Sequence, residues 1–310
     1  MRIVVALGGN ALLRRGDPPD ETVQRHHVRE AAEALAGLAR DHSLVVCHGN
    51  GPQIGLLALE SANDSTLTSP FPLDDLGAQT QGMIGYWLVQ ELSLVGLAGT
   101  PVALVTQVVV DEQDPAFEHP VKFIGLGYTP TEATTLAEAH GWQMRQDGGS
   151  WRRVVPSPEP QEIVELGTIR ALAQTGHLVV CAGGGGIAVV KEPAGGLRGI
   201  ESVVDKDYTA ARLAVDLDVD RLLVLTDVEA VQRDFGTPEA QSLPILGLDE
   251  IELLDLPSGS MGPKVAACAR FVTVTGRFAA IGPIERANDV LHGRAGTTIV
   301  DYNHSLGRTT

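Results

Sequence analysis

Short apolar runs that end in Gly, Asn or Asp alternate along the chain with longer stretches of mixed polarity. Six runs have this form, at residues 3–7, 44–47, 102–105, 178–181, 222–225 and 298–300. Continuous apolar runs of this length are typical of strands that are buried on both faces of a parallel sheet. We therefore expect an open, mainly parallel β-sheet.

The stretches between these runs show the spacing of helices. Val28, Ala31, Leu35 and Leu38 recur every three or four residues, which places them on one helix face. The pattern predicts further helices over 74–94, 161–173, 207–215 and 265–272. Alternating strands and helices indicate βαβ units, so the predicted fold class is α/β, with helices on both faces of the sheet.

Residues 111–160 depart from this pattern. They are rich in Pro, Gly and polar residues, and they contain Lys122 and two of the three tryptophans. A stretch this long without clear core periodicity is typical of a lid or a small lobe, and the alternative is an irregular surface insertion. We expect a single domain over residues 1–310, with a protruding lobe inserted at about 111–160.

Charge narrows the range of partners. The formal net charge is −16 at pH 7, whereas surfaces that bind nucleic acid or anionic membranes need clustered positive charge. No apolar run reaches the ~18 residues of a membrane span, and the first run is too short for a signal peptide. The three cysteines form no CxxC pair. We expect a cytoplasmic protein that binds small molecules, with no nucleic-acid or membrane partner.

Lysine is rare on this chain. Only four of the 23 basic residues are lysines, at positions 122, 191, 206 and 264. The compact ammonium group of lysine suits phosphate oxygens that move, whereas guanidinium is planar and rigid. The alternative is a biased composition plus chance, but Lys122, Lys206 and Lys264 lie near Gly- or Asp-rich motifs. We interpret these three as candidate phosphate-binding residues.

Three of the predicted strands end in glycine-rich loops. These loops contain Gly8, Gly9 and Asn10, then Gly49, Asn50 and Gly51, and finally Gly183 and Gly184. Backbone N–H groups of such loops can approach an anion at the carboxyl ends of the strands, where α/β sheets bind ligands. A tight turn would also explain any single loop.

Two common nucleotide motifs do not fit these loops. No GxxxxGK[ST] segment is present, which excludes a P-loop. The second loop resembles a dinucleotide fingerprint, but Gly55 comes one residue too late for GxGxxG. A dinucleotide fold also needs one such loop rather than three. Pro52 suits the first turn of a helix whose N-terminus could hold an anion.

Two of the lysines lie at predicted helix starts. Lys206 lies between Asp205 and Asp207, and Asp207 can hold its ammonium group in place while leaving other N–H donors for a phosphoryl group. Lys264 precedes the helix predicted from residue 265. For the segment around Lys206 alone, an exposed N-cap with an ion pair is the simpler interpretation, and for the segment around Lys264 the alternative is a capped helix start.

Taken in order, the motifs resemble the carbamate kinases of the amino acid kinase family. The resemblance rests on GGNAL (8–12), CHGNGPQIG (47–55), QGMIGYWL (81–88), TQVVVD with DPAF (106–117), WRRVVPSPEP (151–160), GGGGI (183–187), VDKD (204–207), LTDV (225–228) and GSMGPK (259–264). These segments span nearly the whole chain. Their number and order are far more specific than any one of them.

The resemblance implies a three-layer α/β/α fold, usually a homodimer, with a small lobe over the active site. It implies Mg²⁺-dependent, reversible transfer of a phosphoryl group between ATP and carbamate, and a place in arginine metabolism. The implied catalytic residues are Lys122, Lys206, Asp207 and Lys264; substrate and phosphoryl group would lie around Gly8, Gly9, Asn10, Gly49, Asn50 and Gly51; and the nucleotide would lie near Gly183, Gly184, Thr226, Asp227, Val228, Met261 and Gly262.

The segment around Lys122 departs from the family pattern. PVKFIGLG stands where PTKPIGP is usual, and Ala188 stands where proline is usual. These changes affect how Lys122 is positioned, but they remove no charged group. We therefore expect activity to be retained.

We expect in-line transfer without a covalent enzyme intermediate, because carbamate already carries a nucleophilic oxygen. His48 is interpreted as a positioning or structural residue rather than a base, and Mg²⁺ as held mainly by phosphate and water, with no protein ligand assigned. Two alternatives stay open: a related kinase that acts on another carboxylate, such as that of an amino acid, and a non-catalytic sensor of nucleotide or metabolite.

Overall fold

The computed structural model describes residues 1–302 except 10–11, 15, 98, 255 and 257–260. Within this part of the chain, the central sheet has eight strands in the order β15-β17-β16-β12-β1-β2-β9-β3. Neighbouring strands are parallel except β16 and β17. The strands are β1 (Arg2–Leu7), β2 (Ser43–His48), β3 (Val102–Ala103), β9 (Val179–Val180), β12 (Arg221–Thr226), β15 (Ile245–Gly247), β16 (Ala279–Pro283) and β17 (Thr297–Val300).

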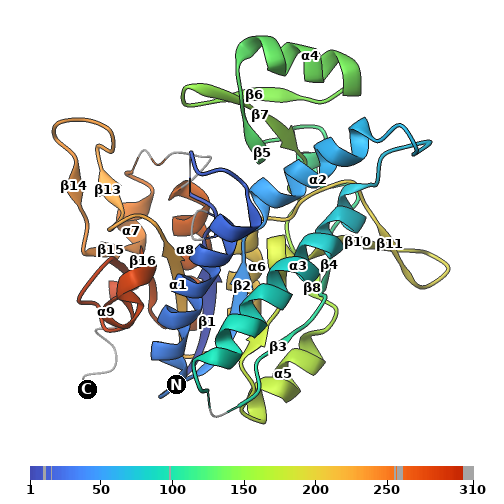
Figure 1. Cartoon of the computed structure of the whole chain (residues 1–310). Helices are drawn as coiled ribbons and strands as arrows, with labels where there is room; N and C mark the ends of the chain where they lie inside the picture. Colours follow the sequence, from blue (N-terminus) through green and yellow to red (C-terminus); the bar gives the residue numbers. More distant parts are fainter. Residues whose placement is uncertain (10–11, 15, 98, 255, 257–260, 303–310) are drawn as a thin grey trace, which may run out of the picture.

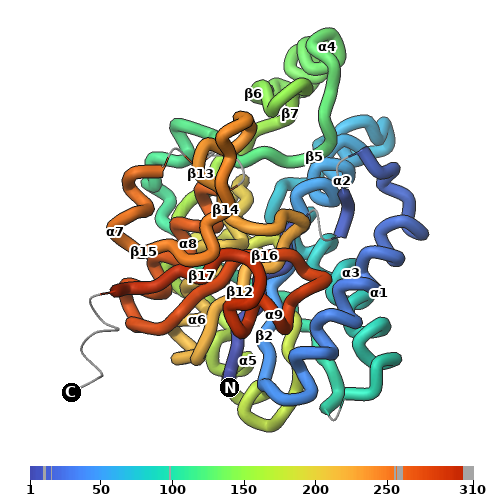
Figure 2. Tube along the Cα trace, turned by 90° about the vertical axis from the view of Figure 1, so that its left-hand side faces the viewer, coloured from blue at the N-terminus to red at the C-terminus, as the bar shows by residue number. Residues whose placement is uncertain are grey.

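Helices cover both faces of this sheet, as the apolar pattern predicts. In β1, Val4 and Ala6 pack into one core with helices α5 (Leu166–Gln174), α6 (Lys206–Asp216) and α8 (Met261–Thr275). Val5 and Leu7 point the other way, into a core with α1 (Glu21–Ala39), α3 (Leu73–Leu94) and α9 (Ala287–Leu291). Figure 2 shows the two helix layers on opposite sides of the sheet. The three-layer α/β/α fold class is confirmed.

A small lobe projects beyond the carboxyl ends of the central strands (Figure 1). It consists of the antiparallel strands β5 (Lys122–Tyr128), β6 (Met144–Asp147) and β7 (Ser150–Val155), together with helix α4 (Pro130–His140). Below it lies α2 (Gly51–Asn63), which contacts β5. We call residues 122–155 the lobe. Its strands bring Lys122 to the edge of the main body.

The remaining strands form two smaller sheets. One has the order β11-β10-β4-β8, and the other is the hairpin β13-β14. Their bounds are β4 (Gln107–Val109), β8 (Glu162–Ile163), β10 (Ile187–Lys191), β11 (Leu197–Gly199), β13 (Gln232–Arg233) and β14 (Gln241–Ser242); the short helices are η2 (Pro115–Phe117), η3 (Gly183–Gly185), α7 (Leu248–Ile251) and η4 (Ile284–Arg286).

Several predicted boundaries are wrong. The helix expected over 161–173 begins only at Leu166, because Glu162 and Ile163 form β8 and pair with β4. The run at 102–105 gives a strand of two residues, and the helix expected from 265 already begins at Met261. Strands β4, β10 and β16 were not among the predicted runs.

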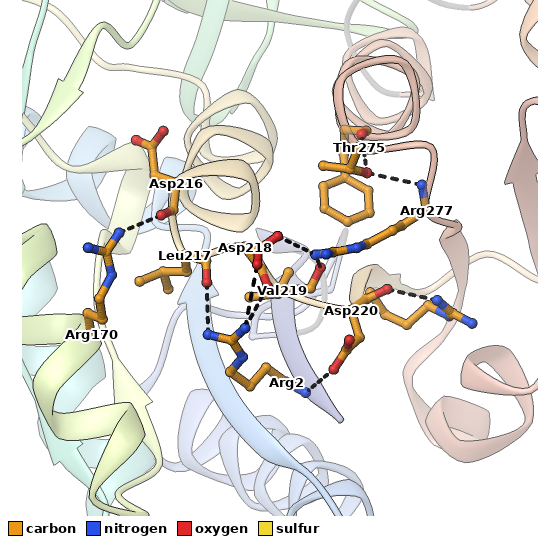
Figure 3. Close-up of polar contacts among 11 residues, drawn as sticks. Arg2, Arg170, Asp216, Leu217, Asp218, Val219, Asp220, Thr275 and Arg277 are labelled. Carbon is orange, nitrogen blue, oxygen red and sulfur yellow. Dashed lines mark hydrogen bonds and ion pairs between the residues drawn. The ribbon is translucent and has the colours of Figure 1, made fainter. Parts of the chain in front are cut away.

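Arginines from three separate parts of the chain hold the C-terminal end of α6 (Figure 3). The last turn of α6 contains no basic residue of its own. The carbonyl groups of its last residue and of the three residues after it accept from distant guanidinium groups instead: Asp216 from Arg170 (2.6 Å), Leu217 and Asp218 from Arg2 (3.2 and 2.9 Å), and Val219 from Arg277 (2.6 Å). Positive charge at a helix C-terminus is favourable. These contacts fix one end of the helix whose other end begins at Lys206.

Within the described chain, no helix combines the length and apolar character needed to cross a bilayer.

Candidate active site

The loops that follow β1, β2 and β12 lie against one another. The Gly8 N–H donates to the Leu225 carbonyl (2.7 Å), and the Gly49 N–H donates to the Leu7 carbonyl (3.0 Å). A Cβ atom at Gly49 would lie only 2.8 Å from the backbone nitrogen of Gly9. Glycine at position 49 is therefore required for this close approach, and the loops form a continuous floor at the carboxyl end of the sheet.

A cavity of about 990 Å³ opens above this floor. Its walls come from the loop after β1, the end of β12, the start of α8, the β13–β14 region and the lobe. Of the predicted residues, Gly8, Gly9, Thr226, Asp227, Val228, Met261 and Lys264 line it. The lobe contributes residues such as Gly125, Asp147 and Arg152, so the cavity lies between the lobe and the main body.

Three lysines and two aspartates gather beside the cavity, and we call them the lysine–aspartate cluster. Lys206 Nζ lies 2.5 Å from Asp207 Oδ1, and Lys264 Nζ lies 3.1 Å from Asp207 Oδ2. Lys122, from the lobe, pairs with Asp205. The Asp205 carboxylate also accepts from the backbone N–H of Asp207 (2.9 Å), which caps the start of α6. One helix start therefore organises charges from three parts of the chain.

Burial and mutual attraction set the charges of this cluster. Burial would raise the pKa of Asp207, but the ammonium groups of Lys206 and Lys264 outweigh it and hold that pKa well below its usual range. Burial lowers the pKa of Lys206, an effect that Asp207 opposes. For Lys264, attraction to Asp207 and Asp205 exceeds the effect of burial, and its pKa is raised. Asp207 is thus a stable anion that two lysines share.

The third glycine loop supports the floor from below. A Cβ at Gly183 would lie 2.3 Å from His48 Nε2, and one at Gly184 would lie 2.1 Å from Asn50 Nδ2. Asn50 is itself buried, and its side-chain amide donates to Thr80 Oγ1 (2.8 Å). Gly183 and Gly184 are not among the described residues that line the cavity. Their assignment to nucleotide binding stays a prediction.

His48 is buried next to the loops. Its Nδ1–H donates to the Gly49 carbonyl (3.0 Å). Burial, with a smaller contribution from nearby Lys206, lowers the pKa of His48 to about 4 against the opposing effect of that hydrogen bond. The imidazole is therefore neutral at pH 7 and fixes the backbone of Gly49, which supports a positioning role.

The structure places the other predicted residues as follows. Gly51 begins α2, and Gly262 lies in the first turn of α8. Asn10 lies outside the described residues. Sequence reasoning missed Asp205, although it is the first aspartate of the VDKD segment. It also missed Arg152, which lines the cavity and lies within the WRRVVPSPEP segment, where the signal was present.

Comparisons with known proteins show the family to which the chain belongs. The family model described as "Amino acid kinase family" matches residues 1–277. Carbamate kinases of Rhizobium meliloti and Haemophilus influenzae are each 47% identical to the chain, over 96% and 99% of it and 93% and 99% of their own lengths. The chain belongs to the carbamate kinases of the amino acid kinase family.

Solved structures extend the similarity to three dimensions. Carbamate kinase from Giardia lamblia bound to citric acid superposes with a TM-score of 0.91 at 38% identity, covering 97% of this chain and 98% of that one. The same protein bound to AMP-PNP gives a TM-score of 0.86 at 37% identity over the same shares of the two chains. The family resemblance seen in the motifs is thus confirmed over the whole fold.

Proposed function

We propose that this chain transfers a phosphoryl group reversibly between ATP and carbamate, giving ADP and carbamoyl phosphate. The chain is a phosphotransferase, as its membership of the kinase family shows. The observation that carries the substrate proposal is the Asp207 carboxylate shared by Lys206 and Lys264 at the edge of the cavity. Such an arrangement presents ammonium groups in fixed positions to a transferring phosphoryl group.

Each charged residue of the cluster receives a role in this proposal. Lys264 lines the cavity and would contact the phosphates directly. Lys206 and Lys122 would stabilise charge on the transferred group, and Asp207 would keep Lys206 and Lys264 aligned. No protein nucleophile is needed, because in phosphoryl transfer the enzyme mainly aligns reactants and stabilises charge.

The glycine loops would contribute space and at least one backbone donor. The N–H groups of Gly8 and Gly49 already donate to carbonyl groups of neighbouring strands. Among the described residues of these two loops, we assign the Gly9 N–H to the phosphoryl group. Thr226, Asp227, Val228 and Met261 also line the cavity, and we assign them to the nucleotide.

The residues present fit a Mg²⁺ ion that arrives with the nucleotide. Among the described residues, no group of three or more His, Cys, Asp or Glu side chains could hold a metal. Mg²⁺ is usually held by one or two carboxylates together with substrate phosphates. Asp227 lines the cavity and acts electrostatically on Lys264, so it is the carboxylate we would assign to the ion. When bound, Mg²⁺ would neutralise charge on the phosphates.

The proposal extends to the cellular setting. We propose a cytoplasmic homodimer that acts in arginine metabolism. The three cysteines are free and buried, which fits a reducing compartment. Size-exclusion chromatography with light scattering tests the dimer, and a mass of one chain would contradict it.

The experiment is ATP formation from ADP, Mg²⁺ and carbamoyl phosphate, measured by luciferase. Wild-type protein should form ATP, and Lys206→Ala should lower turnover by at least ~10²-fold, the effect of losing one preorganised donor. The matched control is Lys191→Ala, because Lys191 is an exposed lysine paired with Glu162 on another sheet. Its turnover should stay close to wild type.

Two results would contradict the proposal. Near-normal turnover of a folded Lys206→Ala variant would remove Lys206 from the mechanism. A folded wild-type protein that binds nucleotide and forms no ATP would point to another acyl-phosphate substrate or to a sensor.

A further inference from the structure

Asp205 has two partners that connect different parts of the molecule. One carboxylate oxygen accepts from the Asp207 backbone N–H (2.9 Å) and caps α6. The other pairs with Lys122 Nζ. The Asp205 side chain is 9% exposed and that of Lys122 is 27% exposed, so solvent screens this pair less than a surface ion pair. A residue needed only as a helix cap would not require the second partner.

Lys122 belongs to the lobe, whereas Asp205 belongs to the main body. Lys122 begins β5 and pairs with Val155 of β7. A lysine side chain loses much of its rotamer freedom when it is fixed in one position. A charged partner at the start of α6 holds that side chain in place before any substrate arrives.

The charges of the cluster explain why the partner is a carboxylate. Asp207 already binds Lys206 and Lys264. With Asp205 in place, each of the three lysines has an aspartate partner and the cluster carries a small net positive charge. Without the Asp205 carboxylate, the three lysines would have only Asp207 between them, and repulsion from Lys206 and Lys264 would drive Lys122 away.

We propose that Asp205 is a positioning residue for phosphoryl transfer, which holds Lys122 of the lobe against the start of α6 beside Lys206 and Lys264. This inference rests on the proposed function for its kinetic consequence. Its structural content, that Asp205 fixes Lys122, is independent of the substrate.

The variant that separates this role from capping is Asp205→Asn. Asparagine caps helices about as well as aspartate, so its side-chain oxygen can still accept from the Asp207 N–H. Its side chain is neutral, so Lys122 loses its ion-pair partner. A pure capping role predicts no change of turnover in this variant, whereas a positioning role predicts a loss.

The kinetic arm measures kcat and KM in the ATP-forming assay, with melting temperature as the check on folding. Asp205→Asn should lower kcat by about 10²-fold, the scale of a 1 Å misplacement of a reacting group. In a Lys122→Met background, the same substitution should lower kcat by no more than about 2-fold, because the ammonium group that Asp205 positions is already absent. Glu162→Gln, which removes the partner of exposed Lys191, is the matched control and should leave kcat unchanged.

The second arm needs no substrate. The chain has only four lysines, so acylation by an amine-reactive ester can be followed at each one by mass spectrometry. Labelling of Lys122 should rise several-fold in Asp205→Asn, while labelling of Lys191 stays unchanged. In Glu162→Gln, labelling of Lys191 should rise while labelling of Lys122 stays unchanged.

The outcomes distinguish the two proposals. Three results would each overturn the inference. The first is a wild-type kcat in Asp205→Asn, and the second is an equally large loss of kcat from this substitution in the Lys122→Met background. The third is unchanged labelling of Lys122 in Asp205→Asn. Absence of ATP formation by the wild type would overturn the proposed function, and the labelling would still decide whether Asp205 holds Lys122.

Discussion

The contact between α2 and the lobe makes Gly55→Ala an informative substitution. Gly55 of α2 lies against Gly125 of β5, and a Cβ at position 55 would lie 2.1 Å from both N and Cα of Gly125. Real Cβ contacts are essentially never shorter than 3.0 Å and ordinary contact begins at 3.4 Å, so α2 and β5 must separate by about 1 Å. Both clashing atoms are backbone, which no side-chain rotation can move aside.

This separation should reach the active site through β5. Lys122 lies three residues before Gly125 on the same strand, so it would leave its place beside Asp205. Misplacement by 1 Å can cost about 10²-fold in rate, and we expect turnover to fall by that order. The free energy of unfolding should fall by only about 0–2 kcal/mol, because overpacking costs about 1–3 kcal/mol while alanine in a helix recovers up to about 1 kcal/mol.

The assay is ATP formation at saturating ADP and carbamoyl phosphate, with urea unfolding in parallel. Gly37→Ala in α1 is the matched control, since nothing lies within 4 Å of its added Cβ. That control should keep full turnover, and its free energy of unfolding should rise by about 0.5–1 kcal/mol. A folded Gly55→Ala protein with wild-type turnover would refute the link between this contact and Lys122.

Three further predictions follow from the site. Asp207→Asn should lower the free energy of unfolding by about 3–5 kcal/mol and turnover strongly, because it leaves two lysines without their shared buried anion; unchanged thermal melting would contradict this. Burial lowers the pKa of His48 from 6.5 to about 4, so between these values the unfolded chain binds a proton that the folded chain does not. Stability should therefore decrease as the pH is lowered through that window, by up to about 1.4 kcal/mol per pH unit. Urea titrations of His48→Gln should show a weaker dependence of the free energy of unfolding on pH. Excess EDTA should abolish ATP formation and added Mg²⁺ restore it, whereas full activity in EDTA would argue against the metal.

The central layer could be predicted from sequence because its strands are buried on both faces. Runs such as 3–7 and 222–225 are continuously apolar and end in glycine or polar loops, so both the strands and their ligand-facing ends are visible. Strand β16 was missed because Ala279–Pro283 has one large apolar residue, Ile281, among two alanines, Gly and Pro, which resemble a loop. Strand β8 has only two residues, and its partner β4 lies more than fifty residues earlier in the chain.

The sequence predicted most residues of the candidate site but not the contacts between them. The rarity of lysine and the glycine loops singled out Lys122, Lys206 and Lys264, and these do gather around two aspartates. The pairing of Lys122 with Asp205 joins residues 83 positions apart, and the contact of Gly55 with Gly125 joins two different elements. Nothing in the local pattern of one sequence specifies such distant pairs.

The arginine contacts at the far end of α6 restrict how this helix can change length. The helix has 11 residues between the cluster at its start and the carbonyl groups held by Arg2, Arg170 and Arg277. One inserted residue would shift one end by about 1.5 Å and turn it by about 100° relative to the other. Either the arginines would lose their carbonyl groups or Lys206 would leave Asp207 and its neighbours. Point substitutions on the exposed face of α6 should thus be tolerated far better than any insertion or deletion within it.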